Sequence, residues 1–350
     1  MEEVEEKSSK LFWILLISII LIVIVIVVLV FWFLSINIQC GDGTKINECS
    51  MNKPYMCEDS GSGLYLISRA VECGCPENLT KEGNFCNSKY QTGEKEISLN
   101  YFVDGEKGQI DYVVYKGMVD YVSNLSKVIS YSGGQVPSRE DFYLRDINNA
   151  EQRELILPLV IEIQNLAEDK TDQARIAISL VQNIFYNQSN KVLDFWYGSV
   201  NYSRYPYEVL YEEQGICGEK SELMALLLKE LGFGVAILYY PSENHAAVGL
   251  KCPAKYSVDE TGYCFVETTG PAIITDDEIK YVGTGVLFSK PEVFIIADGD
   301  LLENNLYEYG DAEDLKGIRK EISQGYISAS NQKKFDALKE RYNLVDEYYA

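Results

Sequence analysis

The chain has 350 residues, a formal charge of -22 and 47% hydrophobic residues. This hydrophobic content excludes a disordered acidic tail, and the length allows one or two domains with their own cores. The excess of 53 acidic over 31 basic residues argues against nucleic-acid binding, which depends on Lys and Arg. A single histidine disfavours a His-ligated metal site, and we expect no metal or organic cofactor.

Residues 11–36 predict a membrane anchor. The run LFWILLISIILIVIVIVVLVFWFL carries no charge, and as a helix it would extend about 36 Å, against about 30 Å of hydrocarbon in a bilayer. A cleaved signal peptide is disfavoured because the run is long and no small-residue cleavage site follows it. Lys7 and Lys10 lie close before the run, whereas the next base is Lys45. The positive-inside rule therefore predicts a single-pass protein with residues 1–10 in the cytoplasm and the remainder outside.

Residues 37–90 form a small Cys-rich module. Six cysteines fall within 47 residues: Cys40, Cys49, Cys57, Cys73, Cys75 and Cys86. An even number of cysteines so close together predicts disulfides in an oxidising compartment. The sequence does not determine which of the six cysteines pair with one another. The alternative, a zinc site in an intracellular protein, is disfavoured because the module has neither a Cys-x-x-Cys pair nor a histidine.

Residues 91–300 show strand patterns, then helical ones, then strands again. ISLNYFVDG and GQIDYVVYKGMVDYV alternate apolar and polar residues around Gly turns, which predicts paired strands. Apolar residues at helical spacing predict helices over 151–167, 172–186 and 218–231. Short β-rich runs follow at 234–240, 245–250, 263–269 and 291–297, and residues 301–350 form an acidic, helical extension. This order predicts an α+β fold.

Three residues of this region suit nucleophilic acyl transfer. Cys217 begins the best-formed helix, where the positive end of the helix dipole favours a thiolate. His245, the only histidine, opens a strand, and Glu267 lies in another short strand. An imidazole can pair with the thiolate and protonate a leaving group, and a carboxylate on its other nitrogen stabilises the imidazolium. The order and residue types together predict a Cys-His-Glu triad.

The count of cysteines supports Cys217 as the free thiol. Cys252 and Cys264 bracket a loop between two strands and form a natural disulfide pair, which leaves one cysteine of nine. The pairs His245–Glu267 and Cys252–Cys264 cannot both be directly opposite in one antiparallel register. We therefore expect either a β-bulge or a diagonal disulfide at the tip of the hairpin.

The stretch YPYEVLYEEQGICGEKSELMALLLKELGFGVAILYYPSENHAAVGL (205–250), followed by YCFVETT, resembles the transglutaminase-like superfamily of papain-type fold. The shared features are a YP-x-E-x-L lead-in, a Gly-x-Cys helix start, an H-x-A-V-G strand and an E-T-T strand. The resemblance implies a core of helices packed on an antiparallel sheet, with Cys217 as nucleophile, His245 as general base and acid, and Glu267 where Asp is common. It also implies an oxyanion hole made by the Cys217 backbone N–H and an upstream side chain, for which Trp196, Tyr211 and Gln214 are candidates.

The chain departs from the pattern Gly-Asp-Cys-Glu-Asp of similar members, because Ile216 and Gly218 flank its cysteine. Glu219 and Lys220, in the first turn, would have opposing effects on the thiolate. We expect a membrane-anchored cysteine peptidase, amidase or transglutaminase with a protein or peptide substrate. The alternative is a non-catalytic adhesion or assembly protein that uses this core as a binding module. The sequence leaves the substrate and the oligomeric state open.

Overall fold

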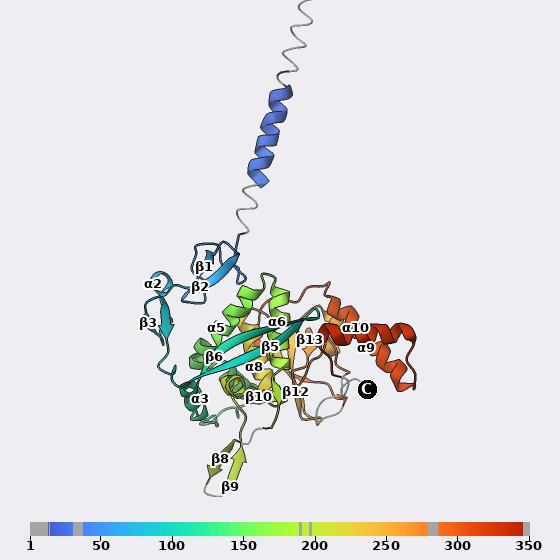
Figure 1. Cartoon of the computed structure of the whole chain (residues 1–350). Coiled ribbons are helices and arrows are strands. Elements are labelled where there is room, and N and C mark those ends of the chain that lie inside the picture. The colour runs from blue at the N-terminus through green and yellow to red at the C-terminus, as the bar shows by residue number, and fades with distance from the viewer. Residues whose placement is uncertain are drawn as a thin grey trace, which may run out of the picture.

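The computed structural model describes residues 13, 15–30, 38–188, 191–195, 198–278 and 286–345. Residues 15–30 are helical, and nearly all their side chains are exposed (Figure 1). None of the helices in these ranges is both long enough and apolar enough to cross a bilayer. The span expected over 11–36 lies partly outside the described residues.

The Cys-rich unit consists of short elements held by three disulfides. Its elements are β1 (Tyr55–Asp59), β2 (Leu64–Ser68), α2 (Ala70–Cys73), β3 (Thr80–Glu82) and β4 (Phe85–Asn87). The disulfides are Cys40–Cys57, Cys49–Cys73 and Cys75–Cys86. All six cysteines of the module are therefore paired, as their even number and close spacing predicted.

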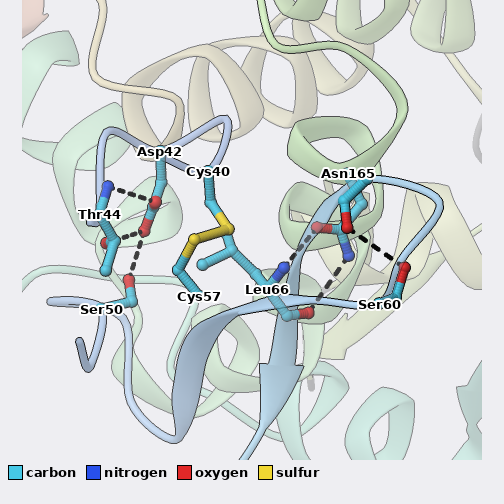
Figure 2. Close-up of a disulfide and its surroundings, with 9 residues drawn as sticks. Cys40, Asp42, Thr44, Ser50, Cys57, Ser60, Leu66 and Asn165 are labelled. Atoms are coloured by element: carbon cyan, nitrogen blue, oxygen red, sulfur yellow. Dashed lines mark hydrogen bonds between the residues drawn. A yellow bond between two sulfur atoms is a disulfide. The ribbon is translucent and has the colours of Figure 1, made fainter. Parts of the chain in front are cut away.

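The Cys-rich unit is attached to the main body by hydrogen bonds to its backbone. Figure 2 shows Asn165, near the end of α5 (Ala150–Leu166), beside β2. Its side-chain amide accepts from the Leu66 N–H at 2.7 Å and donates to the Leu66 carbonyl at 3.2 Å. Gln173 of α6 (Lys170–Gln182) donates to the Gly41 carbonyl at 2.7 Å. These contacts fix the unit against two helices of the main body.

The main body begins with a hairpin and a group of helices. The hairpin pairs β5 (Glu94–Val103) with β6 (Glu106–Tyr115). The expected second strand ends at Tyr115, because KGMVDYVS forms helix α3 (Lys116–Ser123). Met118, Val119 and Val122 face the core from one side of that helix, which is helical spacing and not the alternation of a strand. The helices α4 (Arg139–Ile147) and α7 (Pro206–Glu212) and the strands β7 (Phe185–Tyr186), β8 (Val192–Phe195), β9 (Gly198–Asn201) and β10 (Gln214–Gly215) complete this part.

A four-stranded antiparallel sheet packs on the central helix α8 (Cys217–Glu230). Its strand order is β13 (Tyr263–Val266), β12 (His245–Lys251), β11 (Val235–Tyr240) and β14 (Glu292–Ala297). The face towards α8 belongs to the main apolar core, which includes Ile237, Val248 and Leu250. The chain is thus a mixed α+β protein with small antiparallel sheets, which confirms the predicted class at that level.

The C-terminal extension forms two helices, α9 (Tyr307–Ser323) and α10 (Ala329–Tyr342). Leu315 and Ile318 of α9 and Leu338 of α10 form a second apolar cluster with Leu238 and Phe265 of the sheet. The extension therefore covers the face of the sheet that α8 leaves open.

The structure contains the disulfide expected between Cys252 and Cys264. In the ladder of β12 and β13, Cys264 is opposite Leu250, so Cys252 reaches it diagonally. Val248 is opposite Val266, and continuing this register would place Glu267 opposite Ala247, two positions from His245. Neither the Cys252–Cys264 pair nor the His245–Glu267 pair is therefore directly opposite. Cys252 lies two residues after the residue opposite Cys264, and His245 lies two residues before the position opposite Glu267. The register of β12 and β13 needs no β-bulge, and the diagonal alternative is the one that the structure adopts.

Candidate active site

Local sequence explains why Cys217 lies at the beginning of a helix. Glu219 accepts the Ile216 N–H at 3.0 Å and so caps the helix from its third residue. The same carboxylate accepts the Arg204 N–H at 2.7 Å and pairs with the Arg204 guanidinium at 3.0 Å. Arg204 is buried and also pairs with Glu212 at 2.7 Å. The charge of Glu219 is therefore balanced by that of Arg204.

Lys220 is buried and connects three segments around the nucleophile. Its ammonium donates to the carbonyls of Ile184 at 2.6 Å, and of Gln182 and Thr269 at 3.3 Å. Burial lowers the pKa of Lys220 to about 7, so near neutral pH the amine carries only part of its charge. The expected effect of Lys220 on the thiolate is thus reduced, and the residue serves to position the chain on either side of the site.

His245 and Glu267 form a buried pair. Nε2 of His245 lies 3.0 Å from Oε2 of Glu267, and each side chain is 1% exposed. Burial alone lowers the pKa of His245, but the charge of Glu267 and hydrogen bonds with Cys217 and Glu267 outweigh it and raise the pKa to about 10. The imidazole is therefore protonated at neutral pH. Since Nε2 faces Glu267, Nδ1 is the nitrogen that remains for Cys217.

The segment Glu267-Thr268-Thr269 supports the triad through each of its residues. The backbone N–H and the hydroxyl of Thr269 donate to Oε1 of Glu267 at 2.7 and 2.6 Å. Burial raises the pKa of Glu267, but His245 and these two hydrogen bonds lower it below the usual value. The hydroxyl of Thr268 donates to the Cys217 carbonyl at 3.3 Å. The E-T-T segment thus holds the carboxylate ionised and ties it to the start of α8.

Cys217 is the only cysteine outside a disulfide, since all nine lie in the described part of the chain. It is half-buried and opens, together with His245, onto a cavity of about 810 Å³. Residues of α4 also line the cavity. A cysteine beside a protonated imidazole, at the edge of a cavity, supplies the nucleophile and the acid that acyl transfer requires.

Two of the three expected oxyanion candidates, Tyr211 and Gln214, do not lie at this cavity. The ring of Tyr211 lies under the Lys95 ammonium, 5.1 Å from ring centroid to nitrogen, and the Gln214 amide accepts from Asn187 at 2.9 Å. Neither Tyr211 nor Gln214 lines the cavity. Trp196 lies outside the described residues.

Tyr186 does not line the cavity but lies near Cys217 and Glu267, and the sequence interpretation missed it. It lies on β7, whose parallel pairing places it beside Gly215, two residues before Cys217. Burial, followed by the charges of Cys217 and Glu267, raises the pKa of Tyr186, so its hydroxyl remains a hydrogen-bond donor close to both groups. The sequence gives no separate signal for Tyr186, because the residue directly follows a long apolar helical pattern, which predicts a helix up to 186. The structure ends that helix, α6, at Gln182.

No match to the chain was found among protein-family models, curated proteins or solved structures. Within the described ranges, no group of three or more His, Cys, Asp or Glu side chains is placed to hold a metal ion. The functional interpretation therefore depends on the geometry of the site.

Proposed function

We propose that the protein is a cysteine acyl-transfer enzyme of transglutaminase-like type that acts on peptide or side-chain amides. The observation that carries this proposal is the array of Cys217, His245 and Glu267, in which half-buried Cys217 and His245 line the cavity and buried Glu267 holds the imidazole. The similarity of the 205–250 stretch and of the E-T-T segment to that superfamily supports it independently. Four disulfides, in turn, support an oxidising compartment outside the cytoplasm.

In the proposed reaction the Cys217 thiolate attacks the amide carbonyl carbon, and the carbonyl oxygen becomes an oxyanion. The Cys217 backbone N–H, at the N-terminus of α8, and the Tyr186 hydroxyl are the donors we assign to it. As the C–N bond breaks, imidazolium His245 gives its proton to the leaving amine and the acyl group remains as a thioester. Neutral His245 then takes a proton from water or a second amine, which attacks the thioester and releases Cys217.

Water as the second nucleophile makes the protein a peptidase or amidase, and a lysine amine makes it a transglutaminase. Both outcomes use the same first half-reaction, so the thioester is the species to detect. We further propose that apolar residues 11–36 anchor the protein in a membrane, with residues 1–10 cytoplasmic and the catalytic part outside.

Alkylation by iodoacetamide tests the first requirement. The full chain, purified in detergent without reductant, is treated at pH 7 and the modified residue is mapped by mass. We expect rapid modification of Cys217 and near-complete loss of that reactivity in His245→Ala, because the imidazolium is what maintains the thiolate at this pH. Incubation with a glutamine-containing peptide and a labelled amine then separates transfer from hydrolysis. An unreactive Cys217 in the folded protein would refute the enzyme and favour a non-catalytic adhesion or assembly module.

A further inference from the structure

The cavity beside Cys217 has a charge opposite to that of the chain. Apart from His245, which is paired with Glu267, its ionisable lining consists of Lys127, Arg139, Arg145, Asp146 and Glu222, within a protein of net charge -22. Arg145 and Asp146 neutralise one another through two hydrogen bonds, of 2.6 and 3.0 Å. The remaining bases, Lys127 and Arg139, therefore set the sign of the cavity.

Neither of these two bases forms an ion pair with a residue that the structure describes. Arg139, the first residue of α4, is exposed, and its guanidinium lies 3.9 Å from the centroid of the Tyr239 ring. The Lys127 ammonium lies 4.0 Å from the centroid of the Tyr205 ring and donates to the Val122 carbonyl at 3.1 Å. Burial lowers the pKa of Lys127 to about 8, so most of its charge is present at pH 7. Both cations are thus available to an anionic group in the cavity.

Glu222 adds a hydrogen-bond donor to the same wall. It is 5% exposed, and its Oε2 is buried without a hydrogen-bond partner among the described residues. Burial is the largest of the causes that raise the pKa of Glu222 well above its usual range, and this favours the protonated form, which can donate a hydrogen bond. Five residues after Cys217, it lies about 7.5 Å further along the helix axis. A buried polar atom without a partner is costly, and a ligand oxygen would satisfy it.

We propose that this cavity selects acyl donors that carry a carboxylate near the reacting carbonyl, bound by Arg139 and Lys127 and by a hydrogen bond from Glu222. This inference rests on the proposed function, since it assigns a substrate class to the same nucleophile. A carboxylate fits the set because it pairs with both cations and accepts a short, charge-assisted hydrogen bond from a neutral carboxyl. The carboxylate can come from an acidic side chain or from a peptide C-terminus.

Bromoacetyl amino acids test the proposal, because Cys217 displaces bromide from each through the same chemistry. The probes are bromoacetyl-glutamate amide, bromoacetyl-glutamine amide, bromoacetyl-lysine amide and bromoacetyl-glutamine with a free carboxylate. Second-order rates of Cys217 modification are measured on the full chain at pH 7 and divided by the rate of each probe with N-acetylcysteine. We expect at least one carboxylate probe to exceed the glutamine amide by about tenfold, the effect of one hydrogen bond to a charged group.

Variants assign the effect to the cavity. Arg139→Gln and Lys127→Gln should each reduce the carboxylate preference, and Arg139→Glu should shift it towards the lysine probe. Lys89→Gln is the matched control, because Lys89 is also exposed over a tyrosine ring, that of Tyr90 at 4.9 Å, but lies outside the cavity. The bromoacetamide rate of each variant shows that its nucleophile is intact.

The outcomes separate this inference from the proposed function. Faster reaction of the glutamate amide assigns the preference to a side chain, and faster reaction of the free acid assigns it to a terminus. Equal rates for all four probes, or a preference for lysine, would overturn the carboxylate inference and leave the nucleophile standing. If no probe modifies the folded protein, the proposed function fails and the inference fails with it.

Discussion

Replacing Glu267 by glutamine should inactivate Cys217 while preserving the shape of the site. Thr269 donates two hydrogen bonds to Oε1 of Glu267, so in the variant that position must be the carbonyl oxygen. The NH₂ group then occupies the position of Oε2, 3.0 Å from Nε2 of His245, and donates to it. The imidazole must consequently carry its single proton on Nδ1, which faces Cys217. A histidine in this tautomer cannot accept the thiol proton.

The size of the effect follows from the pKa of His245. A pKa of about 10 in place of 6.5 corresponds to about 5 kcal/mol in favour of the imidazolium. Glu267 makes the largest contribution that raises the pKa of His245, so its neutralisation should remove on the order of 3 kcal/mol of this preference, or about 10²-fold in the proton affinity of the imidazole. We expect Glu267→Gln to slow iodoacetamide alkylation of Cys217 at pH 7 by about that factor, measured by intact mass.

A matched control separates this effect from the cost of neutralising any buried acid. Glu308 is 2% exposed and pairs with Arg175 at 2.9 Å, away from the cavity. Glu308→Gln should reduce the free energy of unfolding and leave alkylation of Cys217 unchanged. A folded Glu267→Gln protein that alkylates at the wild-type rate would refute the assigned role of the carboxylate.

Three further outcomes follow from the same geometry. Tyr186→Phe should lower turnover of an ester substrate by about 10²-fold, the effect of one oxyanion donor, and leave iodoacetamide alkylation intact because that reaction forms no oxyanion; equal losses in both assays would contradict the assignment. Because its pKa is raised, His245 keeps the proton that it donates to the leaving amine up to about pH 10, so kcat/KM for an amide should decline above that pH. A decline with a midpoint near pH 6.5 would mean that the leaving-group proton has another source. Arg204→Met leaves the carboxylate of Glu219 buried without its cation, and urea unfolding should show a loss of about 3–5 kcal/mol; a smaller loss would mean that Glu219 takes up a proton or reaches water.

The elements that the sequence predicted well are those whose patterns are local. The helix from Cys217 has leucines four residues apart and ends before Gly232, and the structure places α8 within one residue of the predicted bounds. The strand at 245–250 was equally clear, because its apolar residues are bounded by turn residues. By contrast, KGMVDYV contains β-branched and aromatic residues that fit strand and helix alike, and only packing against the core decides for the helix.

The oxyanion donor that we propose, Tyr186, could not be found in this way, because its position depends on a pairing between distant segments. Tyr186 comes beside Gly215, two residues before Cys217, through a two-residue parallel contact of β7 with β10, and so short a pairing leaves no periodic pattern. Tyr211 and Gln214 were attractive because they are close to Cys217 in sequence. The structure shows that the chain from Tyr211 to Gln214 instead faces Lys95 and Asn187.

The start of α8 shows why periodicity located the helix but not the roles of its residues. Glu219 caps the helix and binds Arg204, and Lys220 holds carbonyls from two other segments. Ser221 donates to the Ala246 carbonyl at 3.1 Å, and Glu222 faces the cavity. Four consecutive residues thus point to four different surroundings, all of them buried, so this turn has no polar face for a pattern to reveal. The charged residues of this turn suggest a solvent-exposed surface in the sequence. In the fold they are buried, and Glu219 and Lys220 hold partners on segments that only the tertiary structure brings close.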